Sequence, residues 1–203
     1  MIVVGLTGNY GMGKSTVAKM FAASGAVTLD TDEVVREILK DGAVIDEVKK
    51  TFGDDIAEGG TLRKDKLADM VFEDSSLRIT LENILHPRVF EAVDRVIAEV
   101  ARRGGPSVVV VEAPVLFERG YENRFDKIVT VYASEDVAIA RLSEKGIPEE
   151  SARRRLRSQF SIEKKLSASD FAVDNGRDRR YTEEQVKKIY NELVKLERRL
   201  GNN

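Results

Sequence analysis

The sequence of 203 residues contains no cysteine, no tryptophan and a single histidine. The lack of cysteine excludes disulfide bonds and thiolate metal sites, and it suits an intracellular enzyme without establishing the compartment. The sequence has no large excess of either charge, because it contains 33 Lys and Arg and 35 Asp and Glu. A general nucleic-acid binder needs a basic excess to neutralise phosphates, so this balance argues against that class.

Long apolar runs are missing as well. The first run covers about six residues, which is short of the roughly 7–15 in the core of a signal peptide, and no basic start precedes it. No segment approaches the roughly 20 apolar residues of a membrane-spanning helix. We therefore expect one cytoplasmic domain of ordinary size, which contacts neither membrane nor nucleic acid.

Five short segments rich in valine and isoleucine are typical of buried strands. They cover residues 2–7, 26–30, 107–113, 127–133 and 171–175. The first four alternate too little with polar residues for a half-exposed sheet, which favours parallel strands covered on both faces. Helical patterns separate the segments, so we predict an α/β fold with a five-stranded parallel sheet flanked by helices.

Two connections are longer than the fold requires. Glu33 to Pro106 joins the second and third strands, where a crossover needs only about a dozen residues. We expect an inserted helical subdomain there, and a second excursion between the fourth and fifth strands. The last helix is predicted to begin with a capping box, Thr182 to Gln185, and to pack on the core.

Four glycines lie within nine residues, one inside the first apolar run and three in the segment that directly follows it. The segment GNYGMGKS matches the pattern G-x-x-x-x-G-K-[ST] between a predicted strand and a predicted helix. In such a phosphate-binding loop (P-loop), backbone N–H groups cradle phosphates at a helix N-terminus. Lys14 would reach the β- and γ-phosphates, and the Ser15 hydroxyl would ligate Mg²⁺. The alternative is a glycine-rich turn with a surface lysine. We expect ATP to bind at Gly8, Asn9, Tyr10, Gly11, Met12, Gly13, Lys14, Ser15 and Thr16.

Asp32 follows the end of the second strand, where open parallel sheets place their ligands. Phosphoryl transfer to an alcohol needs a carboxylate that accepts the hydroxyl proton, and we favour Asp32 for this role. The competing interpretation is a helix N-cap. Arg36 would lie on the same helical face, where it would hold an anionic acceptor or pair with Asp32.

Seven segments, spread over nearly the whole chain, resemble the sequence motifs of one protein family. They are, in order, GLTGNYGMGKSTV, LDTDEVVRE, TLRKDKLADMVF, LENILHPRV, VVEAPVLFE, RLSEKGIPEESARRRLRSQ and KKLSASDFAVDN. Together they resemble the dephospho-coenzyme A kinase family, and D-x-D-x-x-x-R and L-H-P are more specific than the P-loop. The resemblance implies a P-loop nucleotide-kinase-like core (1–32, 105–138 and 168–203), a substrate-binding insertion (about 33–104) and a lid (about 139–167). It implies transfer of the γ-phosphate of ATP, with Mg²⁺, to the ribose 3′-hydroxyl of dephospho-CoA.

Three positions depart from the family's pattern. Glu112 stands where an aspartate is usual, so a carboxylate near the metal is kept but moved by a methylene. The lid sequence retains Arg141, whereas Lys145 replaces an arginine and loses its planar fork, which shifts catalytic weight to Arg141. Ala138 stands where the family often has a glutamine.

The remaining candidates each have a structural alternative. For His86 we rank fixing a turn at Pro87 above holding substrate, and Arg63 and Arg88 are candidates for substrate phosphates. Asn175 would line the adenine or form a plain turn. Phe117 is expected in the core, although its place near a strand end keeps acceptor contact open. The basic segment SARRRLRSQ is expected to be mainly a solvated face, some of which reaches phosphates if the lid closes.

Two rival functions are compatible with a P-loop. Another small-molecule or nucleoside kinase would share the core, but D-x-D-x-x-x-R with L-H-P tells against it. A GTP-binding switch would need the guanine-reading N-K-x-D, which does not occur in the sequence. We expect a monomer or small homo-oligomer that acts on dephospho-CoA.

Overall fold

The computed structural model describes residues 1–200, with only the backbone described for Phe72, Ser75 and Leu200. The chain divides into two compact units. We call Met1–Asp30 with the chain from Val100 onward the sheet unit, and Thr31–Glu99 the insertion unit. Each is described by itself. Among the described residues, no helix is both long and apolar enough to cross a membrane.

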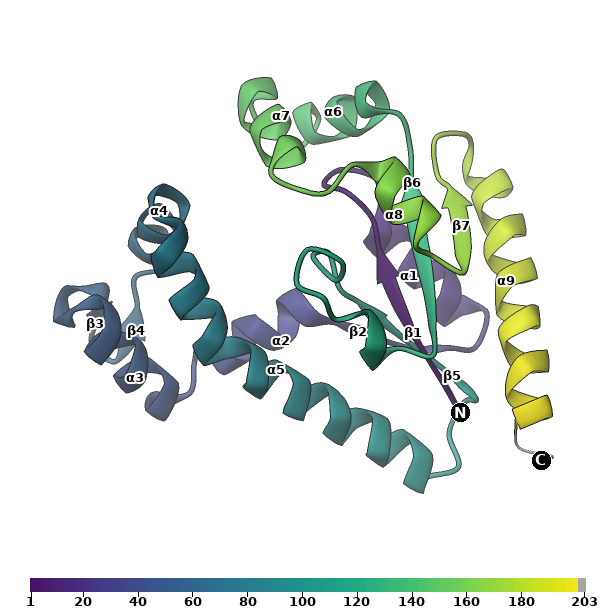
Figure 1. Ribbon diagram of the computed structural model, residues 1–203, viewed down its shortest axis with the longest axis horizontal. Coiled ribbons are helices and arrows are strands. Elements are labelled where there is room, and N and C mark those ends of the chain that lie inside the picture. Colours follow the sequence, from purple (N-terminus) through teal and green to yellow (C-terminus); the bar gives the residue numbers. More distant parts are fainter. Residues whose placement is uncertain (201–203) are drawn as a thin grey trace. The chain divides into compact units, whose positions relative to one another are not determined.

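The sheet unit is built on five parallel strands in the order β2-β5-β1-β6-β7 (Figure 1). The strands are β1 (Ile2–Thr7), β2 (Val27–Asp30), β5 (Val108–Glu112), β6 (Lys127–Tyr132) and β7 (Phe171–Asp174). All five predicted strands are present, and the predicted fold class is confirmed. The first strand in the chain is central, so the loop that follows it lies at the middle of the carboxyl edge.

Both faces of the sheet are covered by apolar side chains. Helices α1 (Lys14–Ala23) and α9 (Arg179–Leu200) pack on one face, where alternate β1 residues such as Val4 and Leu6 are fully buried. On the other face, Leu116, Phe117 and Ile128 form a second cluster. Phe117 is 6% exposed, so the prediction of a core position is confirmed.

Three further helices follow the fourth sheet strand: α6 (Glu135–Ser143), α7 (Glu149–Arg157) and α8 (Ile162–Ser167), and a short 3₁₀ helix, η2 (Glu122–Arg124), precedes that strand. In α7 the apolar Ala152 and Leu156 are buried. Its arginines at 154, 155 and 157 are exposed, so the expected solvated basic face is confirmed.

The insertion unit is mainly helical. It contains α2 (Thr31–Ile38), α3 (Gly42–Phe52), η1 (Asp54–Ile56), β3 (Ala57–Glu58), β4 (Thr61–Leu62), α4 (Lys64–Glu73) and most of α5 (Ser75–Arg102). Its core is an apolar cluster that includes Val48, Phe52 and Ile56. The β3–β4 hairpin was not predicted. Gly59 and Gly60 both have positive φ, which a two-residue turn of this kind requires.

Two predicted helix boundaries are wrong. Pro87 neither starts a helix nor forms a turn, because it lies inside α5. A proline removes its own N–H bond and its ring crowds the carbonyl four residues earlier, but burial of Ile84, Leu85 and Val89 around it offsets this cost and favours a continuous helix. The capping box at Thr182 is also absent, since α9 begins at Arg179.

Asp178 accepts a hydrogen bond from the Tyr181 amide at 2.9 Å, which is the contact that an N-cap residue makes. The two residues of the expected capping box, Thr182 and Gln185, contact the end of β7 instead. Thr182 is fully buried, and its hydroxyl lies 3.2 Å from Asn175 Oδ1. Gln185 donates to the Asp174 carbonyl. The long-range contacts with β7, which the sequence does not reveal, explain these polar side chains.

Candidate active site

The segment Gly8–Ser15 runs from the end of β1 into the first turn of α1, as its motif predicts (Figure 1). Helix α1 begins at Lys14, and its N-cap residue, Gly13, is left-handed with φ 92° and gives no side-chain cap. The positive end of the helix dipole therefore faces the loop without a protein carboxylate or hydroxyl at the cap. An arrangement of this kind favours a phosphate group.

Two of the loop glycines are required by close approach of the protein itself. Gly8 has φ 145°, and a Cβ there would overlap the Val131 carbonyl oxygen in β6. Gly13 lies against the Asn175 side chain at the end of β7, and a Cβ there would overlap its Nδ2. These positions favour glycine for packing as well as for access to phosphate.

Lys14, Ser15 and Glu112 converge on the carboxyl edge of the sheet. Lys14 is 9% exposed, and its ammonium donates to the carbonyls of Gly8 at 3.0 Å and Asn9 at 3.3 Å. The Ser15 hydroxyl donates to Glu112 Oε1 at 2.9 Å, and Glu112 is 7% exposed at the end of β5. The two residues predicted to serve the metal are therefore direct neighbours.

The chemistry of this pair suits Mg²⁺. Magnesium prefers oxygen ligands, and in proteins it is held by one or two carboxylates, waters and substrate phosphates rather than by a full protein cage. Ser15 and Glu112 supply a hydroxyl and a carboxylate, and Asp30 is the register neighbour of Glu112 on β2. Within residues 1–200, no group of three or more metal-binding side chains is present.

Arg141 and Asn175 meet on the other side of the loop. Asn175 Nδ2 donates to the Met12 carbonyl at 2.9 Å, and Arg141 Nη2 donates to the Asn175 carbonyl at 2.8 Å. Arg141 Nη1 is buried and has no hydrogen-bond partner among the described residues. Lys145, in contrast, is exposed beyond the end of α6. Arg141 therefore contacts Asn175, which in turn contacts the P-loop, whereas Lys145 makes no such contact among the described residues.

The other predicted site residues belong to the insertion unit. Asp32 and Arg36 are exposed on α2, and Arg36 Nε donates to the Asp32 carbonyl at 3.2 Å, as their i, i+4 spacing predicts. Because α2 begins at Thr31, Asp32 lies within the first helical turn rather than at the cap. Its charge is favourable there next to the helix N-terminus.

Arg63, His86 and Arg88 have different surroundings. Arg63 is exposed before α4, and the half-buried His86 ring lies 6.4 Å from that of Phe90. Arg88 has partners within the unit, with Nη2 at 2.6 Å from Glu47 Oε2 and Nη1 at 2.5 Å from the Ile84 carbonyl. Arg88 therefore joins α3 to α5, in addition to any contact with substrate.

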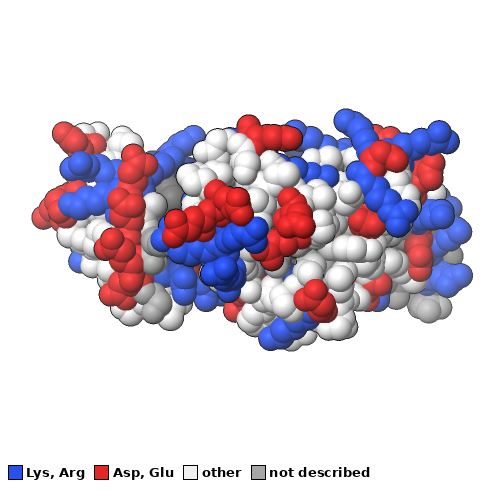
Figure 2. Space-filling model, turned by 90° about the horizontal axis from the view of Figure 1, so that it is seen from above, with Lys and Arg blue, Asp and Glu red and all other residues white. Residues whose placement is uncertain are grey.

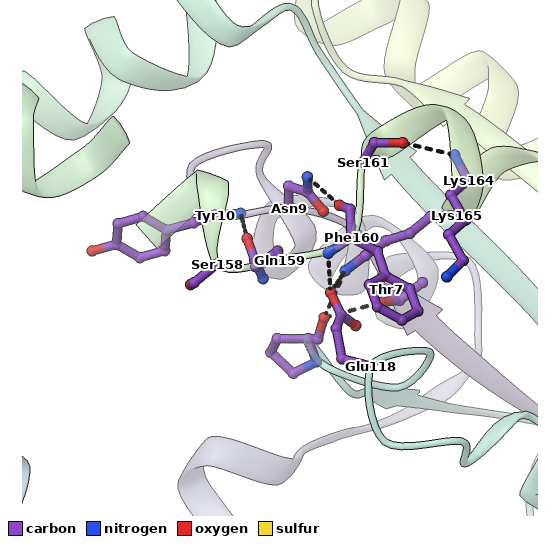
Figure 3. A network of polar contacts seen from close by, with 12 residues as sticks. Thr7, Asn9, Tyr10, Glu118, Ser158, Gln159, Phe160, Ser161, Lys164 and Lys165 are labelled. Atoms are coloured by element: carbon purple, nitrogen blue, oxygen red, sulfur yellow. Dashed lines mark hydrogen bonds and ion pairs between the residues drawn. The ribbon is translucent and has the colours of Figure 1, made fainter. Parts of the chain in front are cut away.

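Sequence reasoning missed one set of polar residues around the loop. Glu118, Gln159 and Lys165 lie in three separate segments, and the structure connects them to Asn9 and Tyr10 (Figure 3). Burial lowers the pKa of the Lys165 ammonium, and its hydrogen bond and ion pair with Glu118 offset part of that effect. No spacing in the sequence indicates these contacts, since a lysine in KKLS reads as a surface residue.

Several known proteins are similar to this chain along nearly its whole length. The sequence profile described as dephospho-CoA kinase matches residues 2–199. The dephospho-CoA kinase of Aquifex aeolicus is 38% identical over 95% of this chain and 97% of its own. A solved structure from Thermus thermophilus has a TM-score of 0.81 and 30% identity, covering 95% of this chain and 97% of its own.

A second solved structure shows the same fold at lower identity. The dephospho-CoA kinase from Campylobacter jejuni has a TM-score of 0.70 at 24% identity, covering 95% of this chain and 97% of its own. The profile and the Aquifex relative both extend over nearly the full length, across the sheet unit and the insertion unit alike. The chain therefore belongs to the dephospho-CoA kinase family.

Proposed function

We propose that this protein transfers the γ-phosphate of ATP to the ribose 3′-hydroxyl of dephospho-CoA, giving coenzyme A and ADP. The observation that carries the proposal is the group at the P-loop in which Lys14 and Glu112 are buried and the exposed Ser15 donates its hydroxyl hydrogen bond to Glu112. It occurs in a chain that matches the family from end to end. The bond from the γ-phosphorus to the β–γ bridging oxygen breaks, and one to the 3′-oxygen forms.

In this proposal the P-loop and Lys14 hold the phosphates of ATP. Residues 8–16 supply backbone N–H groups, and Lys14 supplies a cation whose position is set by two loop carbonyls. Asn175 and Arg141 lie beside Gly13, where they bind the nucleotide at the opposite side of the loop from Glu112. Arg141 is proposed to stabilise the charge of the transferring phosphoryl group through its unpaired Nη1.

Ser15 and Glu112 are proposed to hold Mg²⁺, Ser15 as a direct ligand and Glu112 through a bound water. The ion would neutralise charge on the β- and γ-phosphate oxygens. The protein's contribution is to fix two oxygens 2.9 Å apart at the end of β5. The longer side chain of Glu112 reaches the Ser15 hydroxyl, which supports this role.

The acceptor is proposed to bind through the insertion. Asp32 accepts the proton of the 3′-hydroxyl, and its exposure leaves the carboxylate accessible. Arg36, Arg63, His86 and Arg88 are proposed to contact the acceptor's phosphates and ribose. We retain the division into a core, a substrate-binding insertion at about 33–104 and a lid at about 139–167 as part of this proposal.

The protein is proposed to act in the cytoplasm as a monomer or small homo-oligomer, without nucleic acid or membrane as partners. On the face in Figure 2, basic and acidic side chains are interspersed. With a net charge of −2, this mixture supports a small-molecule substrate over a polyanion or an anionic membrane surface.

A panel of acceptors tests the proposal. With ATP and Mg²⁺, we expect ADP release to be slow alone and to rise strongly with dephospho-CoA, and much less with AMP, nucleosides or small acids. Phosphorus NMR of the product should place the new phosphate on the ribose 3′-oxygen. Stimulation by AMP or a nucleoside, with dephospho-CoA inert, would instead support another P-loop kinase. Tight GTP binding without transfer would favour a switch.

A further inference from the structure

A lysine and a glutamate form a buried ion pair next to the phosphate-binding loop. Lys165 in α8 is 0% exposed, and its ammonium lies 2.7 Å from Glu118 Oε1 in the segment that follows β5. The same ammonium donates to the Pro114 carbonyl at 3.1 Å. Of the lysines and arginines among the described residues, only Lys14 is comparably buried.

The pair is connected to the first half of the P-loop. Glu118 Oε1 also accepts the backbone N–H of Phe160 at 3.0 Å. The Phe160 carbonyl accepts a hydrogen bond from Asn9 Nδ2 at 3.0 Å, and Gln159 Oε1 accepts the Tyr10 amide at 2.8 Å. Figure 3 shows Glu118, Lys165 and the Phe160 backbone gathered next to Asn9, while Tyr10 joins the network through its backbone amide and its ring points away.

The pair is connected to the metal side of the site as well. The Pro114 carbonyl that Lys165 contacts also accepts the Thr7 hydroxyl at 3.2 Å. Thr7 is the residue before Gly8, and Pro114 lies two residues after Glu112, which holds Ser15. One ammonium group therefore supports both flanks of the phosphate site.

Stability alone accounts poorly for this arrangement. Removing two charges from water is costly, and a buried ion pair is often no more stabilising than apolar residues of similar volume. Glu118 Oε2 is buried and has no hydrogen-bond partner among the described residues, which adds to the cost. The contacts instead lead to Asn9 through Phe160, and to the Pro114 carbonyl two residues after Glu112.

We propose that Lys165 is a positioning residue for phosphoryl transfer, which sets the geometry of the P-loop through Glu118 and Phe160 and that of the Glu112 side through Pro114. The role rests on the proposed kinase function, and Lys165 touches neither substrate in it. Phosphoryl transfer is sensitive to alignment, and a displacement of about 1 Å costs on the order of 10²-fold in rate. Loss of the ammonium should therefore act on ATP use more than on folding.

Lys165→Met tests the positioning role of Lys165, because methionine has a side chain of similar length and carries no charge. Kinetic constants are measured well below the melting temperature, where the protein is folded. We expect kcat/KM for ATP to fall about tenfold or more, while KM for dephospho-CoA changes less than about twofold. Calorimetry with ATP alone should show weaker binding, and this measurement does not depend on the identity of the acceptor.

Lys127→Met is the matched control. Lys127 pairs with Asp170 at 2.6 Å, and Asp170 also accepts a backbone amide, that of Ile128. This pair has the same two kinds of group as Lys165–Glu118, but it is more exposed and lies at the start of β6, at the end of the sheet away from the P-loop. We expect the control to retain its ATP affinity and kcat.

A folded Lys165→Met protein with unchanged ATP affinity and kinetics would overturn the proposal, and so would an equal loss in the Lys127→Met control. If Lys165→Met does not fold, the double variant Lys165→Met with Glu118→Gln decides, because it leaves no unpaired carboxylate buried. That variant should fold and still show the tenfold loss. Failure of the proposed function is separate, since wild-type protein would then not phosphorylate dephospho-CoA.

Discussion

The sheet unit and the insertion unit differ in what they bury. Among the described residues, every buried polar or charged side chain lies in the sheet unit: Thr7, Asn9, Lys14, Glu112, Thr130, Lys165, Asn175 and Thr182. The buried side chains described in the insertion unit are apolar, as in its cluster around Val48. Its candidate functional residues are exposed or half-buried instead.

This difference separates two ways of placing a functional group. A buried polar group must have partners, so its position is set by several protein contacts at once. Lys14, held by two carbonyls, is of this kind. An exposed group such as Asp32 is held weakly by the protein and stays accessible. We therefore expect the sheet unit to provide rigid nucleotide chemistry and the insertion unit an adaptable acceptor surface.

The largest effect is expected from a substitution in the sheet unit. Lys14→Ala removes the cation that stabilises charge on the transferring phosphoryl group, so we expect kcat to fall by about 10³-fold or more. Circular dichroism should show an intact fold, because helix α1 keeps its apolar buried face. Near-normal turnover in a folded variant would remove the P-loop lysine from the mechanism.

Asp32→Asn tests whether an exposed carboxylate of the insertion unit takes part in the reaction. The amide keeps the shape but cannot accept a proton, so we expect kcat to fall by about 10²–10⁴-fold with ATP binding nearly unchanged. Because Asp32 is exposed, the melting temperature should change little. Glu33→Gln is the matched control, since Glu33 is the exposed neighbour in the same helical turn and should retain full activity.

A loss confined to the melting temperature of Asp32→Asn would show that the carboxylate serves the helix N-terminus alone. The insertion unit would then contribute no reactive group at this position.

The smallest of the three effects distinguishes Arg141 from Lys145. Arg141→Lys loses the planar fork that joins the Asn175 carbonyl to the surroundings of Gly13, so we expect a loss of about 10²-fold in kcat. Lys145→Ala, at an exposed position of the same region, should lose less than about threefold. Equal losses in the two variants would contradict the assignment of the lid charge to Arg141.

Much of the sheet unit was predictable from local patterns. Continuous valine-rich runs identified all five parallel strands, and the glycine spacing with Lys14 and Ser15 identified the P-loop, because these signals come from residues adjacent in the chain. Elements that depend on competing local signals were predicted less well. The β3–β4 hairpin was missed although Gly59–Gly60 is a turn signal, and Pro87 was given too much weight as a helix breaker.

By itself, the sequence determined the order of the elements, the phosphate-binding loop and the family motifs, since each depends on short spacings along the chain. Only the tertiary structure decided that Ser15 contacts Glu112, that Arg141 meets Asn175, and that Lys165 and Glu118 lie behind Asn9 and Tyr10. These partners come from separate segments, and their pairing follows from strand order and helix packing. The cost of burying a polar group without a partner is what makes such pairings specific, and that cost arises only when the chain has folded.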